Sequence, residues 1–318
     1  MTTQPWTRRD VLRTASVAGL AAVQTGSVSD ARQAPVSSNR PFLFALNTST
    51  ISGFKPKIVE AMAIAAKAGY DGIEPWIREL DAHVKGGGSL EDLGKQARDL
   101  NLKVVDVIGF FEWAVDDDAR RAKGLEEARR NMEMVAKVGG TRIAAPATGA
   151  TDPSGPKLDL DRVGERYRAL LELGKDFGVT PIVEVWGFSK NLQTLAEATH
   201  VAIAANHPDA AILADVYHLH KGGSGFAGLK LLGPGAVPIL HINDYPDKPR
   251  QALTDADRVY PGDGVAPLPA ILRTLRDTGF KTALSLELFN RDYWKLDAAT
   301  VAATGLAKIK AAVASTMG

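Results

Sequence analysis

Cysteine is absent from this 318-residue sequence, and its absence excludes three kinds of site. The chain cannot form a disulfide framework, use a thiolate nucleophile, or bind zinc or an iron–sulfur cluster through cysteine. Hydrophobic residues make up 45% of the chain, which is ordinary for a globular protein and enough for a large core. We therefore expect a fold stabilised by burial and not by covalent cross-links.

A large excess of charge of one sign is also missing. Lys and Arg total 38 against 37 Asp and Glu, so the formal net charge is +1. Proteins that bind nucleic acid or anionic membranes through a general surface carry a basic excess. The composition argues against both kinds of partner and leaves open only a local basic patch.

The sequence has no hydrophobic run near its N-terminus that is long enough for a stable membrane anchor. Residues Ala15–Val23 form a short apolar stretch, and Arg8 and Arg9 precede it. Paired arginines before a weakly apolar stretch resemble a twin-arginine export signal, and small residues at Val28–Ala31 offer a cleavage site.

The expected domain boundaries follow from this signal. We expect residues 1–31 to be a signal peptide, 32–40 a linker and 41–318 a single catalytic domain. The twin-arginine export machinery would then deliver the protein to the periplasm or otherwise out of the cytoplasm. Residues 1–31 carry three arginines and two aspartates, so cleavage leaves a neutral chain. The alternative is an N-terminal amphipathic helix that packs on the body of the protein.

A glycine-rich phosphate-binding loop is absent after the first expected strand, where the sequence reads Asn47–Thr50. Short, nearly continuous apolar runs instead alternate with segments of helical periodicity. The expected strands are Phe42–Asn47, Gly72–Pro75, Leu102–Ile108, Arg142–Ala145, Pro181–Trp186, Ala211–Asp215, Val237–Ile242 and Thr282–Leu288. The expected helices are Lys57–Ala68, Leu90–Leu100, Ala119–Val138, Arg162–Phe177, Leu192–Ala205, Pro267–Thr278 and Ala298–Val313. Eight parallel strand units at this length predict an α/β protein with a single (β/α)₈ TIM barrel.

Charged residues end four consecutive apolar strands of this barrel, the fifth to the eighth: Glu184, Asp215, His241 and Glu287. A carboxylate inside an apolar run is costly unless it is paired or bound to metal. The carboxyl ends of barrel strands lie on one face, where barrel enzymes place their active sites. Three carboxylates and one imidazole suit one divalent ion, Mn²⁺ in the first place, or Mg²⁺, Co²⁺ or Zn²⁺. Taken singly, each residue is as typical of a salt bridge, a helix cap or a hydrogen-bonded core histidine.

Six segments between about residues 41 and 313 resemble the xylose isomerase-like TIM-barrel superfamily, the sugar phosphate isomerase/epimerase group. The ketose 3-epimerase and inosose-dehydratase branches are the most similar. The segments are Gly69–Glu74, Val183–Gly187, Asp215–His218, His241–Asp244, Arg258–Gly264 and Leu286–Glu287. The carboxylates and lysine of the two-metal hydride-shift isomerases are not found, so proton transfer is the expected chemistry.

The resemblance implies roles for individual residues. Glu184, Asp215, His241 and Glu287 would bind one divalent ion, and the two glutamates would also be the acid/base pair on opposite faces of the substrate. Two further residues would bind substrate: His218 would contact a substrate oxygen and Arg258 would anchor a terminal hydroxyl.

Aromatic residues after strand ends are candidates for apolar walls against a sugar ring: Trp76, Phe110, Trp113, Trp186 and Phe188. Packing at the barrel rim is the alternative for each. Glu74, at the end of the second strand, is a candidate to bond a sugar hydroxyl, with a buried ion pair to Arg142 as the alternative. His220 would add a polar contact near the mouth or belong to a solvated loop.

The expected reaction begins with loss of the proton next to a carbonyl. A divalent ion that chelates the carbonyl and a neighbouring hydroxyl stabilises the resulting enediolate, while one glutamate removes the proton and the other returns it. Isomerisation and epimerisation share this intermediate. A lyase or dehydratase acting by β-elimination on a keto-sugar or 3-keto-glycoside also passes through it and is the alternative.

Two other classes fit the fold less well. An AP-endonuclease-like DNA repair enzyme would use a histidine-rich three-metal cluster and bind the DNA backbone, which six histidines and a neutral mature chain argue against. A sugar-binding protein without catalysis would use the ion as a clamp. The expected partner is a small carbohydrate, with no nucleic acid, no stable membrane anchor and a homo-oligomer left open.

Overall fold

The structure is a computed structural model that describes residues 41–317. The expected signal peptide at 1–31 and linker at 32–40 lie outside the described residues. Within the described part, no helix combines the length and the hydrophobicity needed to cross a bilayer.

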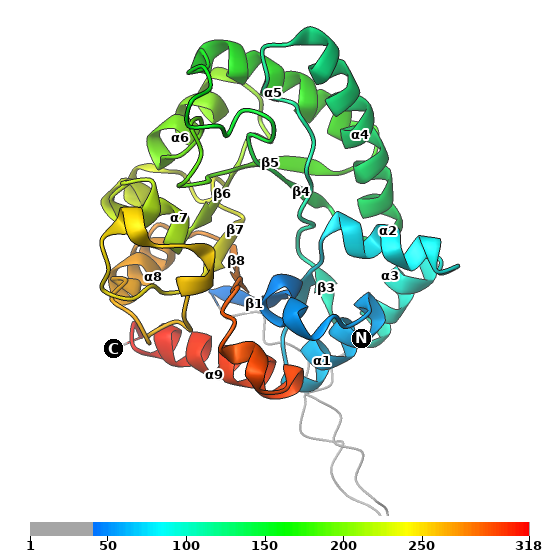
Figure 1. Cartoon of the computed structure of the whole chain (residues 1–318), viewed down its shortest axis with the longest axis vertical. Coiled ribbons are helices and arrows are strands. Elements are labelled where there is room, and N and C mark those ends of the chain that lie inside the picture. The colour runs from blue at the N-terminus through cyan, green and yellow to red at the C-terminus, as the bar shows by residue number, and fades with distance from the viewer. Residues whose placement is uncertain (1–40, 318) are drawn as a thin grey trace, which may run out of the picture. The chain divides into compact units, whose positions relative to one another are not determined.

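Eight parallel strands surround the centre of the molecule, and the helices lie outside them (Figure 1). The strands are β1 (Phe42–Asn47), β2 (Gly72–Glu74), β3 (Lys103–Val104), β4 (Arg142–Ala145), β5 (Thr180–Glu184), β6 (Ile212–Asp215), β7 (Ile239–Ile242) and β8 (Thr282–Leu286). Their order is β3-β2-β1-β8-β7-β6-β5-β4. A single parallel bridge between Ile108 and Ala144 connects the β3 and β4 sides, which confirms the predicted (β/α)₈ barrel.

The helices follow the expected alternation with the strands. They are α1 (Ile58–Ala68), α2 (Ile77–Lys85), α3 (Leu90–Asp99), α4 (Asp118–Lys137), α5 (Leu160–Lys175), α6 (Leu195–Ala204), α7 (Val216–Lys221), α8 (Leu268–Asp277) and α9 (Ala298–Ala314). Short 3₁₀ helices add η1 (Thr48–Phe54), η2 (Phe226–Leu231), η3 (Arg250–Ala252), η4 (Asp255–Asp257) and η5 (Tyr293–Lys295).

Two helices and one strand differ from the expectation. The sequence did not predict α2, in which only Ile77 and Leu80 are buried, or the six-residue α7. The third strand is shorter than the expected Leu102–Ile108, because only Lys103 and Val104 form a ladder with β2. Beyond this ladder the chain continues to Ile108, which bridges both Trp76 and Ala144.

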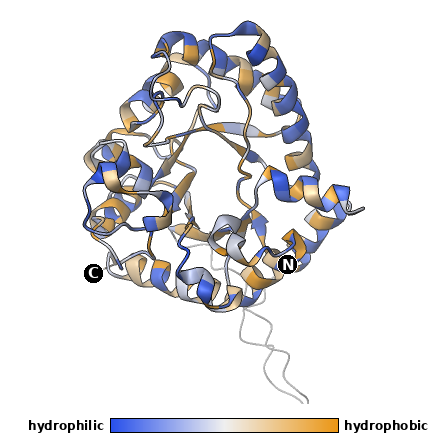
Figure 2. Cartoon of the chain, in the orientation of Figure 1, coloured by the Kyte–Doolittle hydropathy of each residue, from blue (hydrophilic) through white to orange (hydrophobic). Residues whose placement is uncertain are grey.

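Alternation along the strands creates two apolar layers. Side chains such as Phe44 and Leu46 of β1 point outward to the helices and join the large cluster between the sheet and the helix layer. Ala45 of β1, Leu213 of β6 and Ala283 of β8 belong to a smaller cluster that fills the barrel interior. Hydropathy colouring shows the strands mostly apolar and the outer helices with polar faces (Figure 2).

Candidate active site

The inward-facing strand positions are apolar in the middle of the barrel and polar at the carboxyl ends of the strands. Two residues beyond Leu213 lies Asp215, two beyond Ile239 lies His241, and four beyond Ala283 lies Glu287. Because successive strand residues alternate between faces, these side chains point into the barrel at the carboxyl ends of its strands. They are almost completely buried, between 0% and 4% exposed.

Three of the four predicted metal ligands converge. One ligand atom each from Asp215, His241 and Glu287 lies within 4.8 Å of the other two. His241 Nδ1 is 3.1 Å from Glu287 Oε2 and 3.5 Å from Asp215 Oδ2, and it is a buried nitrogen without a well-oriented hydrogen-bond partner. An imidazole nitrogen that faces two carboxylates in this way fits a divalent cation.

Glu184, the fourth predicted ligand, lies beside this group and not within it. Its Oε1 is 3.9 Å from His241 Nδ1, and its Oε2 is buried without a hydrogen-bond partner. Burial raises the pKa of Glu184 to about 8; His241 opposes this change, and the nearby Glu287 adds to it. The carboxyl therefore holds a proton near neutral pH in the absence of a cation.

Glu74 lies behind His241, and its contact with a sugar hydroxyl stays a prediction. Its carboxylate is fully buried and lies 3.0 Å from His241 Nε2. It also accepts hydrogen bonds from Asn47 (2.8 Å) and Ser285 (2.5 Å), and the alternative ion pair with Arg142 is not formed. Burial raises the pKa of Glu74, but the nearby His241 lowers it by more, so the net pKa lies below the ordinary value.

This arrangement defines the orientation of the imidazole. Because Glu74 binds Nε2, the proton on that nitrogen is held and Nδ1 is left to face the carboxylates. Burial lowers the pKa of His241, while Glu287 and Glu74 raise it to a net value well above the ordinary one. A cation would take the place of the proton on Nδ1.

Arg258 connects the carboxylates to His218. Its Nη1 donates to Asp215 Oδ2 (2.9 Å) and Glu287 Oε2 (2.7 Å), and its Nη2 lies 3.0 Å from His218 Nε2. Burial and the neighbouring Arg258 lower the pKa of His218 to about 4. The neutral imidazole thus accepts from the guanidinium at Nε2, which leaves the proton on Nδ1, a buried atom without a partner.

The predicted aromatic residues separate into two groups. Trp76 and Trp186 lie at the mouth of the barrel, and both pack against the Phe110 ring. The ring-centroid distance to Phe110 is 5.3 Å for Trp76 and 5.9 Å for Trp186. Trp113 does not line the site: it is completely buried, donates to the Pro146 carbonyl and packs on Tyr167. Its predicted role as a wall is therefore wrong, because its indole belongs to the layer between sheet and helices.

His220 also lies apart from the cluster. Its ring stacks on Tyr245 with a centroid distance of 4.0 Å. Burial and Arg250 lower its pKa. The structure gives it a packing role and shows no contact with the carboxylates.

Sequence reasoning missed three residues that hold the site together. Asn47 donates to both Glu74 and Glu287, Asn243 donates to Asp215, and Ser285 donates to Glu74. Each occupies an inward position of an apolar strand or lies just past its end. Each of the three polar residues shares the two-residue alternation of the inward-facing positions, and this pattern could have identified them from the sequence.

Asp106 is a fifth buried acid near the site, after Glu74, Glu184, Asp215 and Glu287. It is completely buried, and neither carboxyl oxygen has a hydrogen-bond partner of good geometry. Burial and the adjacent Glu74 raise its pKa well above the ordinary value.

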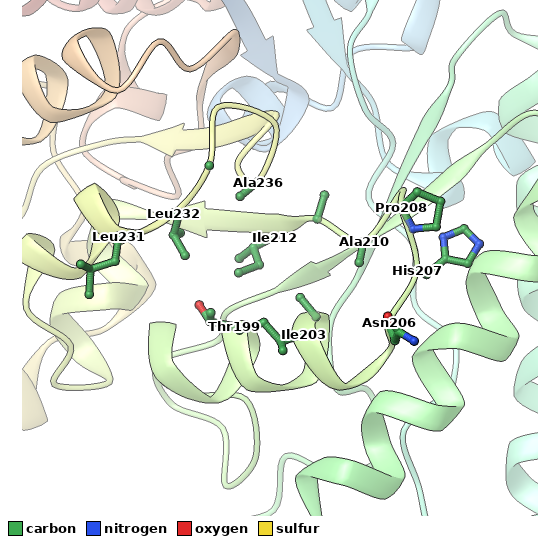
Figure 3. Close-up of a pocket in the computed structure, with 13 residues that line it drawn as sticks. Thr199, Ile203, Asn206, His207, Pro208, Ala210, Ile212, Leu231, Leu232 and Ala236 are labelled. Atoms are coloured by element: carbon green, nitrogen blue, oxygen red, sulfur yellow. The ribbon is translucent and has the colours of Figure 1, made fainter.

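A cavity of about 520 Å³ is lined by none of the buried carboxylates. Figure 3 shows residues that line it. The cavity is lined by Thr199 and Ile203 of α6, the connection from Asn206 to Ile212, and residues 231–236 before β7. These connections precede the strands, so the cavity is at the end of the barrel opposite to the carboxylates. His207 is its one titratable lining residue, and no metal-binding group is found there among residues 41–317.

Several known proteins are similar to this chain in sequence. An inosose isomerase of Bacillus velezensis is 28% identical over 242 residues, which cover 74% of this chain and 85% of the relative. Another, from Bacillus licheniformis, is 31% identical over 184 residues; the match spans 57% of this chain and 66% of that relative, just under two thirds of its length. A 3-dehydroshikimate dehydratase of Pseudomonas putida is 22% identical over 82% of this chain and 40% of its own length.

Solved structures and the family comparison complete the assignment. The IOLI protein, crystallised with a zinc atom, superposes with a TM-score of 0.79 at 24% identity, covering 87% of this chain and 100% of that one. At this identity the likeness supports the fold alone. Residues 62–312 match the family described as xylose isomerase-like TIM barrel. The chain belongs to the xylose isomerase-like TIM barrel family.

Proposed function

We propose that this protein is a divalent-metal-dependent isomerase or epimerase that moves a proton next to the carbonyl of a keto-sugar or keto-cyclitol. The observation that carries the proposal is a pair of buried glutamates with different partners on either side of His241. Glu184 comes from the end of β5 and Glu287 follows β8, so they flank the residues of β6 and β7.

The surroundings of the two glutamates suit opposite roles. Glu287 accepts hydrogen bonds from Arg258 and Asn47, which hold its carboxylate in place as the base that removes the proton. Glu184 lies beside the three-residue group, its Oε2 is buried without a hydrogen-bond partner, and burial raises its pKa to about 8 in the metal-free protein; it is the acid/base partner at the other face or carbon. The reverse reaction exchanges the two roles.

Asp215, His241 and Glu287 would hold the metal ion, with Glu184 beside them. When bound there, a divalent ion supplies Lewis-acid stabilisation of the negative charge that develops on the substrate as its proton leaves. His218 Nδ1, which carries a proton and has no partner, donates a hydrogen bond to a substrate oxygen. Arg258 keeps His218 neutral and in position, and its full burial argues for this role over direct anchoring of a terminal hydroxyl.

The curated relatives support a cyclic ketone as substrate, because several of them are inosose isomerases. A β-eliminating dehydratase is the second candidate, and the similarity to a 3-dehydroshikimate dehydratase is the observation in its favour. Both reactions begin with the same proton abstraction, so they differ only in whether a leaving group departs afterwards.

The test is incubation of the metal-loaded protein in D₂O with inososes, ketoses and 3-keto-glycosides. An isomerase or epimerase would give a product of unchanged mass apart from one solvent deuterium at the carbon next to the ketone. A dehydratase would give a product that has lost one water. Unchanged substrates without deuterium across the panel, with each metal tried, would contradict an enzymatic role.

We also propose export by the twin-arginine route, on the strength of Arg8, Arg9 and the short apolar stretch that follows. Replacement of both arginines by lysine should leave the precursor in the cytoplasm. Appearance of the double variant outside the cytoplasm in the same amount as the wild type would refute this proposal.

A further inference from the structure

Two large apolar side chains are exposed at the mouth of the barrel, next to the proposed active site. Phe110 is 37% exposed and Phe188 is 45% exposed. Both rings contact Trp186, at centroid distances of 5.9 Å for Phe110 and 5.2 Å for Phe188. We call Phe110, Trp186 and Phe188 the rim platform.

The turn that carries Trp186 and Phe188 is fixed by hydrogen bonds and by close packing of its backbone. Ser189 N donates to the Trp186 carbonyl at 2.9 Å, and the buried Ser189 Oγ donates to the Asn191 carbonyl at 2.6 Å. A Cβ at Gly187 would lie 2.2 Å from the His218 carbonyl, so this turn sits directly against α7. The fold therefore exposes the Phe188 ring on a fixed turn, where leaving it in water costs free energy.

The platform begins at the catalytic groups. Trp186 follows Glu184 by two residues, just past the carboxyl end of β5. The Phe188 ring lies 5.6 Å from the His218 ring, centroid to centroid. Glu184 and His218 are buried, whereas the two phenylalanines are open to solvent. A ligand that reaches both places must extend outward from the carboxylates over the aromatic rings.

We infer that the substrate carries a second, aromatic or apolar group beyond the reacting ring, as in an aryl keto-glycoside, and that the rim platform binds this group. The inference rests on the proposed function, because it assumes that the ketone-bearing ring lies between Glu184 and Glu287. Aromatic rings stack on one another in offset or tilted arrangements and bury apolar area, which matches a flat aglycone better than a hydrated sugar.

The test compares two ligands that differ only in the second group: methyl and 4-nitrophenyl 3-keto-β-D-glucopyranoside. Binding to the full-length, metal-loaded protein is measured by calorimetry. The 4-nitrophenyl compound should bind about tenfold more tightly, the size expected for one well-packed aromatic group. Phe188→Ala and Phe110→Ala should each reduce this preference at least about threefold, and the affinity for the methyl compound should stay the same. Ile203→Ala, an exposed apolar position on α6, is the control.

Three results would overturn the inference: equal affinity for the two glycosides, an unchanged preference in both phenylalanine variants, or binding of neither compound. Deuterium exchange into an inosose by the same variants separates this inference from the proposed function. The Ile203→Ala control should exchange at the wild-type rate, because Ile203 lies on α6 away from the proposed active site. Absence of exchange in all proteins, with the aryl preference retained, would contradict the proposed reaction and leave the platform supported.

Discussion

At the scale of single residues, the centre of the site is His241, whose two ring nitrogens face opposite partners. Nε2 meets Glu74 at 3.0 Å, and Nδ1 meets Glu287 at 3.1 Å. Glu74 thereby selects the nitrogen that is available to a cation. The sequence marked Glu74 as a site residue, but it could not show whether the side chain points toward substrate or behind the histidine.

Glu74→Gln should lower metal affinity about 10- to 100-fold, because the neutral amide orients His241 less well and makes it a weaker ligand. Glu79→Gln is the matched control: Glu79 is a half-buried acid that accepts hydrogen bonds from the Thr48 hydroxyl and the Trp76 amide and does not touch the cluster. Calorimetric titration with Mn²⁺ or Zn²⁺ measures both variants. Equal losses in the two would contradict the role assigned to Glu74.

Metal binding should depend on pH through Glu184 and His241. In the metal-free protein burial raises the pKa of Glu184 to about 8, and the surrounding carboxylates raise that of His241 despite its burial. Glu184 holds a proton below about pH 8, and His241 holds one well above its ordinary range; a cation must displace these protons, so affinity should rise as pH increases toward 8. Titrations in buffers of different protonation enthalpy should show at least about one proton released at pH 7, and less in Glu184→Gln. Affinity independent of pH between 6 and 8 would count against this account.

At the scale of elements, the loop between β7 and α8 positions Arg258. Asp244 closes this loop: its Oδ1 accepts from Ala266 N and its Oδ2 from Gly262 N, and its backbone pairs with Val259. Gly264 packs against it so closely that a Cβ would lie 2.2 Å from the Tyr245 carbonyl. The loop can hold an arginine in the barrel only with glycine there.

Gly264→Ala should therefore displace the loop, cost about 1–3 kcal/mol of stability and lower kcat/KM, because Arg258 leaves Glu287 and His218. Gly233→Ala is the control, since its Cβ would have no neighbour within 4 Å and its backbone is not in the left-handed region. Thermal unfolding and steady-state kinetics measure the pair. A Gly264→Ala protein as active as Gly233→Ala would show that the loop does not position Arg258.

At the scale of the whole molecule, alternation of strand residues explains how much the sequence could predict. Apolar runs gave the strands, and the charged residues within them gave Asp215, His241 and Glu287, because a strand's period of two places them in one interior. The sequence could not predict Trp113, whose burial depends on contact with Tyr167 of α5. Nor could it predict that Glu74 binds His241, 167 positions away, since only barrel closure brings them together.

The barrel should be more stable with metal than without it, because the ion binds residues of three strand ends at once and not the unfolded chain. At a free concentration of about 100 times Kd, this contributes roughly 2.7 kcal/mol, enough to raise Tm by several degrees. Asp215→Asn should abolish most of the shift. Thermal scans with and without EDTA measure it, and an equal Tm in both conditions would exclude a site within the barrel.

The central claim, proton transfer between Glu184 and Glu287, is tested most directly by deuterium incorporation from D₂O into an inosose by the wild type, Glu184→Gln and Glu287→Gln. The account predicts one solvent deuterium per turnover in the wild type and a rate lower by about 10²–10⁴-fold in each variant. One variant should still exchange the substrate proton without completing turnover, because each carboxylate serves a different face or carbon. Product without solvent deuterium, or both variants turning over at the wild-type rate, would contradict the account.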